Sequence, residues 1–320
     1  MDIGVLGPCR VTQAGLSVVP TAIKPRKVLA LLALQPDRVV SVSSLIEELW
    51  GGNPPRSVQT TLQTYILQIR NLITRSLVGE DQPDLPLGAK SVLVTEAGGY
   101  LLDTQGGVVD SVEYERLAGA GHRALETGDH AGAAVLFQQA LALWRGPALV
   151  DVQVGPLLEA EVTRLEESRM SILSQRIEAD LRLGRHHEIL GELAGLAAQH
   201  PTHERLQGQL MLALYRAGRR GGALEAYHRM RVVLGRELGL DPSSALQELQ
   251  QAMLASDPGL ECDPVGSLPG GGPLRVVRAV LRRVPHVHAG DHAREEPVHV
   301  GQLHQLVEHV PQRGDDRVRV

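Results

Sequence analysis

Residues 54–76, PPRSVQTTLQTYILQIRNLITRS, decide the fold, because they have the pattern of one long amphipathic helix. Pro55 suits the first turn of a helix, and Ser57 suits a capping position. Apolar side chains recur at the 3.6-residue spacing that places them on one face. The predicted buried face consists of Val58, Leu62, Ile66, Ile69, Leu72 and Ile73.

The opposite face of this predicted helix is polar and contains no acidic residue. Its members are Thr60, Gln63, Thr64, Leu67, Asn71 and Thr74, with Arg70 on the flank. The charged residues of the segment, Arg56, Arg70 and Arg75, are all positive. Short hydrogen-bonding side chains of this kind suit base edges and phosphate oxygens. Taken alone, the segment leaves open a helix that packs on its own domain and exposes a polar face to solvent.

The segments around the helix predict the rest of its domain. They are a strand at 1–6, a hairpin at 10–19, helices at 24–34 and 45–50, a loop at 79–86 and a second hairpin at 92–102. Ser41, Ser43 or Ser44 is expected to cap the helix at 45–50. This order predicts a winged helix-turn-helix in residues 1–105, in which the long helix enters the major groove and the second hairpin is the wing.

Composition indicates a protein of about two or three domains, from 320 residues. The aromatic share is 2%, so the core must consist mainly of aliphatic side chains, which favours helical packing. The net charge is -5. Any DNA contact therefore depends on local cationic clusters. Cys9 and Cys262 form no metal-ligand spacing or disulfide framework, which fits a reducing compartment. We expect no signal peptide and no membrane span, because the N-terminus lacks a basic region and no apolar run is long enough. These features predict a cytoplasmic, nucleoid-associated protein.

Residues 106–262 predict an all-α domain built from tetratricopeptide-like repeats. Three segments share a glycine, small or aliphatic residues five and six positions later, and a bulky residue nine positions later. The glycines are Gly128, Gly184 and Gly218, and the bulky residues are Phe137, Leu193 and Tyr227. The second interval has the 34-residue tetratricopeptide period, and the first contains an insertion. A plain helical bundle is the alternative. With 15 basic and 21 acidic residues, this region has a net charge of -6.

Residues 263–320 change character and predict a disordered or atypical tail. They combine Pro, Gly, Arg, His and Val without periodicity. His286, His288 and His292 lack the further ligands that a metal site requires. The chain has no phosphate-binding loop, nucleophile elbow or zinc-protease motif, so we expect neither an enzyme nor a cofactor.

The ordered motifs of the first 105 residues resemble SARP-type activators, whose winged helix is similar to that of OmpR/PhoB response regulators. The resemblance rests on GVLGPCRV, KPRKVLALLAL, RVVSVSSLIEELWG, PPRSVQTTLQTYILQIRNLI and AGGYLL. The following helical region resembles the bacterial transcriptional activation domain of the same family. The implied fold is mainly α with a small α+β part. One departure is that Gln68 and Asn71 occupy places where family members often carry arginine.

The resemblance and the residues together predict a DNA-binding surface. The resemblance implies contacts from Thr60, Thr61, Gln63, Thr64 and Arg70 on the long helix and from the wing around Thr95. The arginines of the segment and the 24–27 cluster are the available phosphate partners, although that cluster also fits a solvated helix end. The complete expected set is Lys24, Arg26, Lys27, Arg56, Thr60, Thr61, Gln63, Thr64, Gln68, Arg70, Asn71, Arg75 and Thr95.

The resemblance implies a pathway-specific activator of an antibiotic gene cluster. We expect it to bind direct repeats in double-stranded DNA as a homodimer and to recruit RNA polymerase. The alternative is a helical-repeat scaffold whose N-terminal domain has lost DNA binding, which Gln68 and Asn71 keep open.

Overall fold

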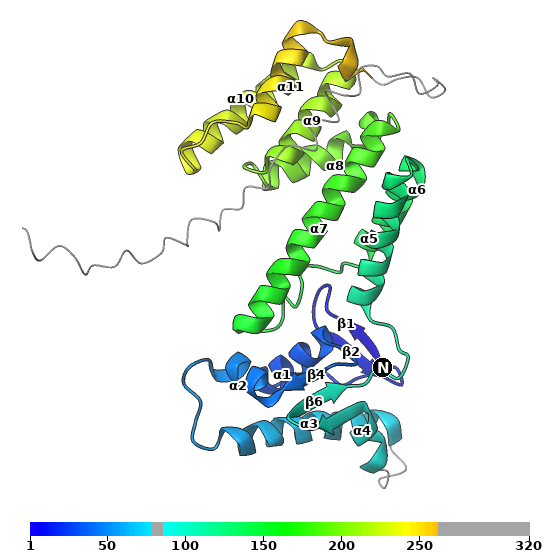
Figure 1. Ribbon diagram of the computed structural model, residues 1–320, viewed down its shortest axis with the longest axis vertical. Coiled ribbons are helices and arrows are strands. Elements are labelled where there is room, and N and C mark those ends of the chain that lie inside the picture. Colours follow the sequence, from blue (N-terminus) through cyan, green and yellow to red (C-terminus); the bar gives the residue numbers. More distant parts are fainter. Residues whose placement is uncertain (79–85, 262–320) are drawn as a thin grey trace, which may run out of the picture.

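The computed structural model describes residues 1–78 and 86–261, and it is mainly helical with a small α+β region at the N-terminus (Figure 1). The N-terminal elements are β1 (Asp2–Gly4), β2 (Arg10–Gln13), β3 (Leu16–Ser17), α1 (Ile23–Leu34), β4 (Val39–Ser41), α2 (Val42–Trp50), α3 (Val58–Val78), α4 (Pro86–Val92), β5 (Leu93–Glu96) and β6 (Gly99–Leu102). The strand orders are β1-β2-β3 in one sheet and β4-β6-β5 in the other, with antiparallel pairing throughout. This confirms the winged helix-turn-helix expected from the sequence.

Helix α3 is the predicted long helix, and its apolar face forms part of the core. Leu62, Ile66, Ile69 and Ile73 are at most 2% exposed. The helix begins at Val58, so Pro55 lies in the preceding turn and the prediction of Pro55 in the first helical turn is wrong. The preceding helix, α2, begins as expected at a serine cap. The Ser41 hydroxyl accepts a hydrogen bond from the Ser44 amide at 3.0 Å.

The wing is the β5–β6 hairpin, and β4 anchors it to the domain. In the register of these strands, Tyr100 of the middle strand β6 lies opposite Val40 of β4 on one side and opposite Thr95 of β5 on the other. Strands β4 and β6 approach so closely that a Cβ atom on Gly99 would lie 2.2 Å from the Val40 carbonyl oxygen. Glycine at this position therefore allows the wing to pair with β4.

A short helix, α4, precedes the wing where the sequence predicts a loop and the start of a strand. Its Ala89 and Val92 are buried, and it packs against α3. Most of the predicted loop at 79–86 lies outside the described residues. The alternation of Val92 and Val94 suggested a strand from Val92 onward, but Val92 is the last residue of α4 and β5 begins at Leu93.

The C-terminal elements are α5 (Asp110–Glu126), α6 (His130–Ala142), α7 (Pro156–Arg182), α8 (His186–Gln199), α9 (Glu204–Arg216), α10 (Arg220–Glu237), α11 (Ser244–Ala255) and the short 3₁₀ helix η1 (Pro258–Leu260). Successive helices form the hairpins α5–α6, α7–α8 and α9–α10. The turn glycines Gly128, Gly184 and Gly218 have φ values of +82°, +76° and +73°. In each hairpin the amide after this glycine donates to a carbonyl five residues earlier, which is the glycine-dependent helix end of a Schellman motif.

The recurrence seen in the sequence therefore corresponds to three helix hairpins. The bulky residues Phe137, Leu193 and Tyr227 are each at most 5% exposed, so they form the interior of these hairpins. Figure 1 shows α7 running from the winged-helix region to α8 and α9, with α5 and α6 alongside it.

The buried core does not divide at residue 105, where the sequence predicts a domain boundary. One cluster of buried apolar residues extends from Met1 through Tyr114 and Phe137 to Ile172. A second cluster extends from Ile177 to Leu260. The winged-helix region and the α5–α6 hairpin thus share one core, and the two clusters meet within α7.

Within residues 1–78 and 86–261, no helix is long and apolar enough to span a membrane. The same residues contain no group of three or more His, Cys, Asp or Glu side chains arranged to hold a metal ion. The predicted tail at 263–320, with its histidines, lies outside the described residues.

Candidate nucleic-acid interface

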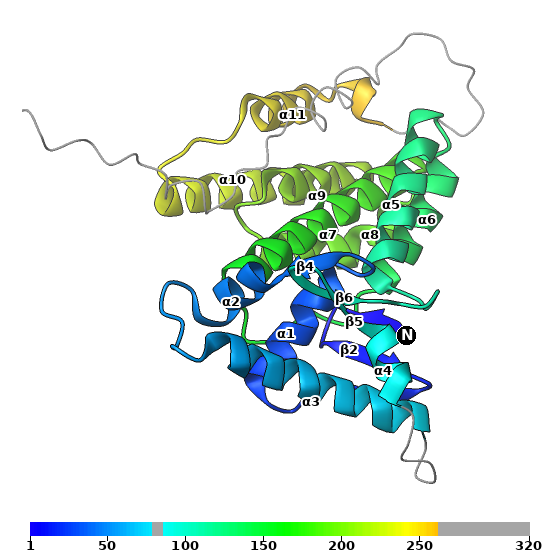
Figure 2. The same cartoon turned by 60° about the horizontal axis from the view of Figure 1, so that its bottom comes forward.

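The exposed side of α3 is mostly polar and has no acidic residue, and we call it the α3 outer face. It consists of Gln59, Thr60, Gln63, Thr64, Leu67, Gln68, Asn71 and Arg75. Figures 1 and 2 both show α3 at the end of the molecule remote from α10 and α11. The exposed Arg56 lies in the turn just before the helix. The structure therefore brings together most of the residues expected from the sequence to contact DNA.

Several hydroxyl groups of α3 are engaged with its own backbone. The Thr61 hydroxyl donates to the Ser57 carbonyl at 3.0 Å, and the Thr64 hydroxyl donates to the Thr60 carbonyl at 2.9 Å. The side-chain amides of Gln59, Gln63, Gln68 and Asn71 make no hydrogen bond to any other described residue. These four amides are therefore the donor and acceptor groups that the helix leaves open for base edges.

Arg70 is a structural link between α3 and the wing. Its Nε and Nη2 atoms donate to the Leu93 carbonyl at 3.0 and 2.7 Å, and Nη2 also donates to the Thr95 hydroxyl at 2.7 Å. Burial lowers the pKa of the Arg70 guanidinium below its usual value. Arg70 and Thr95, both expected to contact DNA, contact each other and fix the wing beside α3.

Lys24 lies near α3 through two aromatic rings. Its ammonium nitrogen is 4.8 Å from the centroid of the Trp50 ring, and that ring stacks on Tyr65 of α3 with centroids 6.3 Å apart. Lys24 is half-buried, and its ammonium group over the Trp50 ring is linked through that ring to Tyr65 of α3.

The other two members of the 24–27 cluster do not fit the expected phosphate contacts. Lys27 is buried, its ammonium lies 3.8 Å from a Glu48 carboxylate oxygen, and it donates to the Glu48 carbonyl at 3.4 Å. Arg26 donates to the Pro20 carbonyl and forms a 3.4 Å ion pair with Asp151. Both side chains therefore have partners within the protein, and their contact with DNA stays a prediction.

Glu48 is a buried carboxylate that the sequence analysis did not identify. It is 2% exposed, and its oxygens accept the amides of Gly155, Leu157 and Leu158 at 2.5, 2.9 and 3.0 Å. It therefore caps the N-terminus of α7, where the amides lack partners within their helix and the helix dipole favours negative charge. The sequence signal for this role is indirect, because Gly155 and Pro156 at the start of α7 offer no capping side chain.

The first residue of α5 and the predicted insertion between the first two repeats make further contacts with the N-terminal region. Asp110 accepts the Val5 and Leu6 amides at 2.9 and 3.1 Å and pairs with Arg145 at 3.2 Å. Asp151 accepts the Cys9 amide at 2.6 Å. Burial, followed by the charge of Asp151, raises the pKa of the Cys9 thiol to about 12. We call these contacts, together with those of Arg26, Lys27 and Glu48, the junction.

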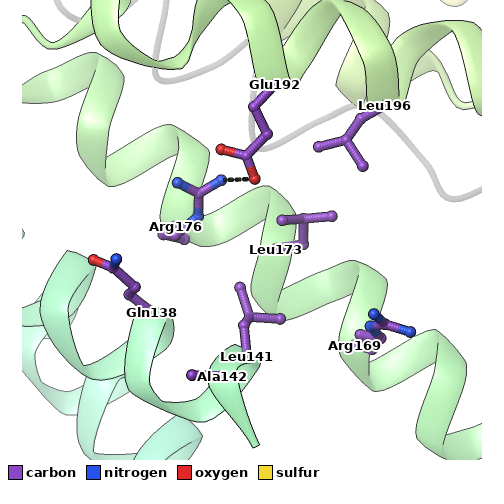
Figure 3. Close-up of a pocket in the computed structure, with 8 residues that line it drawn as sticks. All are labelled: Gln138, Leu141, Ala142, Arg169, Leu173, Arg176, Glu192 and Leu196. Atoms are coloured by element: carbon purple, nitrogen blue, oxygen red, sulfur yellow. Dashed lines mark hydrogen bonds and ion pairs between the residues drawn. The ribbon is translucent and has the colours of Figure 1, made fainter. Parts of the chain in front are cut away.

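A hollow of about 420 Å³ lies in the helical region, away from α3 (Figure 3). Its lining residues are Gln138, Leu141, Ala142, Arg169, Leu173, Arg176, Glu192 and Leu196. Arg176 pairs with Glu192 at 2.7 Å and with Asp180 at 3.3 Å. The Arg169 guanidinium lies 4.7 Å from the centroid of the Trp144 ring. Both guanidinium groups therefore have partners within the protein.

Comparison with known proteins finds a family match for each of the two regions. Residues 18–83 match the family described as transcriptional regulatory protein, C terminal, and residues 109–254 match the bacterial transcriptional activator domain. The regulatory protein DnrI of Streptomyces peucetius is 51% identical over 261 residues, which cover 82% of this chain and 94% of DnrI. The chain belongs to the SARP family of transcriptional activators.

Further relatives agree with this assignment. The transcriptional regulator RedD of Streptomyces coelicolor is 34% identical over 82% of this chain and 72% of RedD. The solved structure of Mycobacterium tuberculosis EmbR, in complex with a low affinity phosphopeptide, has a TM-score of 0.72 and 28% identity, covering 88% of this chain and 68% of EmbR. The transcriptional regulatory domain of this SARP protein implies DNA binding, and the alternative of a scaffold without DNA binding is not favoured.

Proposed function

We propose that this SARP activator turns on an antibiotic gene cluster by binding direct repeats near promoters as a pair of copies and by recruiting RNA polymerase. The α3 outer face supports the proposal, because it is exposed, has no acidic residue and leaves four amides without partners in the described structure. The similarity to the Streptomyces proteins DnrI and RedD supports a regulatory role of this kind. The protein acts in the cytoplasm, at the nucleoid, without a cofactor.

Phosphate contacts orient the α3 outer face in the groove. Arg56 precedes the helix and Arg75 lies in its last turn, while Lys24 adds a charge beside its first half. Such contacts position a protein on the duplex but carry no sequence information. The open amides between them supply the base contacts, because asparagine and glutamine can form paired hydrogen bonds with adenine in the major groove.

Two copies are needed because one winged helix contacts few base pairs, and single-site discrimination is too small for a genome. The junction fixes the helical region relative to α3. That region has a net charge of -6 and would be repelled by phosphates, so it is suited to contact the neighbouring copy and RNA polymerase rather than DNA. Direct repeats one helical turn apart, or a near multiple, place both copies on one face of the duplex.

The test uses the full chain and promoter DNA from its neighbouring genes. A footprint should protect two repeats, and binding to them should be cooperative. Insertion of half a helical turn between the repeats places the copies on opposite faces and should abolish cooperativity, whereas a full turn should restore part of it. Cooperativity that survives the half-turn insertion would contradict the paired arrangement. The full chain is required because a fragment ending at residue 105 would expose the shared core.

A further inference from the structure

Leu67 is more exposed than Leu77, the other large aliphatic side chain that α3 exposes within the described residues. It is 57% exposed and lies midway along the helix. Gln63 is one turn before it and Asn71 one turn after it, and both amides are open. Thr64 lies beside it, and because the Thr64 hydroxyl hydrogen is engaged by the Thr60 carbonyl, its methyl group remains available for apolar contact. The centre of the surface is therefore apolar, with an amide on each side.

No arginine or lysine is available at the centre of the described α3 outer face to contact guanine. Guanine is usually read in the major groove by arginine or lysine. Arg70, the arginine nearest to Leu67 on α3, is engaged by Leu93 and Thr95 of the wing. Arg56 and Arg75 lie beyond the two ends of this central patch.

The chemistry of the major groove supplies a partner for the exposed leucine. The 5-methyl group of thymine is the apolar feature of base-pair edges there, and small apolar groups recognise it by contact. Resting on the proposed function, we propose that Leu67 is a specificity residue that packs against a thymine 5-methyl group. The amides of Gln63 and Asn71 then read the bases on either side of that thymine.

The experiment removes the methyl group from the DNA and the leucine from the protein separately and together. In the footprinted repeat, each thymine is replaced in turn by deoxyuridine, which lacks the 5-methyl group and retains the hydrogen-bonding edge. For the unaltered full chain, one position in each repeat should lose about fourfold in affinity, the effect expected for one apolar carbon removed from contact. For Leu67→Ala, binding to the thymine repeat should be weaker, and deoxyuridine at that position should cause no further loss.

The matched control is Val232→Ala on α10. Val232 is 67% exposed, and this substitution should preserve the response to deoxyuridine. Circular dichroism of Leu67→Ala checks that the exposed substitution leaves the fold intact. An equal response to deoxyuridine in the original chain and Leu67→Ala at every position would overturn the thymine contact. So would a Leu67→Ala protein that binds DNA normally but fails to activate transcription, because that result indicates a protein contact. These results differ from failure of the proposed function, in which the unaltered chain would protect no repeat.

Discussion

The α3 outer face and the junction both contain polar side chains, which are paired within the protein at the junction and largely unpaired on α3. At the junction, the Glu48 carboxylate contacts three amides and Lys27, and Arg26 reaches Asp151. On the α3 outer face, Gln63 and its neighbouring amides have no partner among the described residues. Positive charge alone therefore does not mark the DNA-binding side of this domain. Exposed polar groups without partners in the protein indicate that side better than charge does. Buried polar groups are already hydrogen-bonded within the protein and are not free to contact DNA.

The largest expected effect is at Glu48. Glu48→Ala leaves Lys27 buried without its carboxylate and leaves the first amides of α7 without a cap. Loss of one partner from a buried ion pair typically costs about 3–5 kcal/mol, and chemical denaturation should show a decrease of that size in the free energy of unfolding. The neighbouring Glu47 is exposed, so Glu47→Ala is the matched control and should change stability little. Equal stability of the two variants would show that the junction does not depend on this carboxylate.

Arg70 should behave as a structural residue rather than a phosphate contact. Hydrogen bonds from charged groups contribute about 1.5–3 kcal/mol, so Arg70→Ala should lower the free energy of unfolding by an amount in this range. Arg70→Lys keeps the charge but loses the planar fork that reaches Leu93 and Thr95, and it should also be destabilising. A phosphate contact would instead appear as full stability with a weaker salt dependence of DNA binding in Arg70→Ala.

Gln63 should contribute to sequence discrimination without affecting the fold. Gln63→Ala removes an open amide from the α3 outer face and should weaken binding to the specific repeat by about 1–3 kcal/mol. Binding to a scrambled duplex of equal length should stay unchanged. Gln251→Ala, at an exposed position of α11 remote from α3, is the control. A parallel loss on both duplexes for Gln63→Ala would make Gln63 a positioning residue.

The presence of α3 and most of its apolar face were predictable because they depend on periodicity within one short segment. The buried Leu62, Ile66, Ile69 and Ile73 follow directly from 3.6-residue spacing. The turn glycines were also predictable, since helix ends with positive φ favour glycine. Helix α4 was missed because its seven residues include Pro86 and Gly88, both typical of loops.

The roles of the cations were not predictable from local sequence. Arg26 pairs with a residue 125 positions away, and Arg70 bonds to a strand carbonyl 23 positions away. Glu48 contacts amides more than 100 positions away. In the sequence alone, each of these residues has the features of an exposed helix residue, because its partner is distant along the chain. The shared core was not predictable for the same reason, because it is formed by contacts between segments distant in the sequence.

The most direct test of the central claim is the salt dependence of DNA affinity. Each lost phosphate contact lowers the slope of log affinity against log salt concentration by about 0.9. We expect the double variant Arg56→Ala, Arg75→Ala to lower the slope by nearly two units per copy. Arg26→Ala, which removes one positive charge at the junction, should leave the slope unchanged. A lower slope for Arg26→Ala, or an unchanged slope for the double variant, would contradict the assignment of the α3 outer face to DNA.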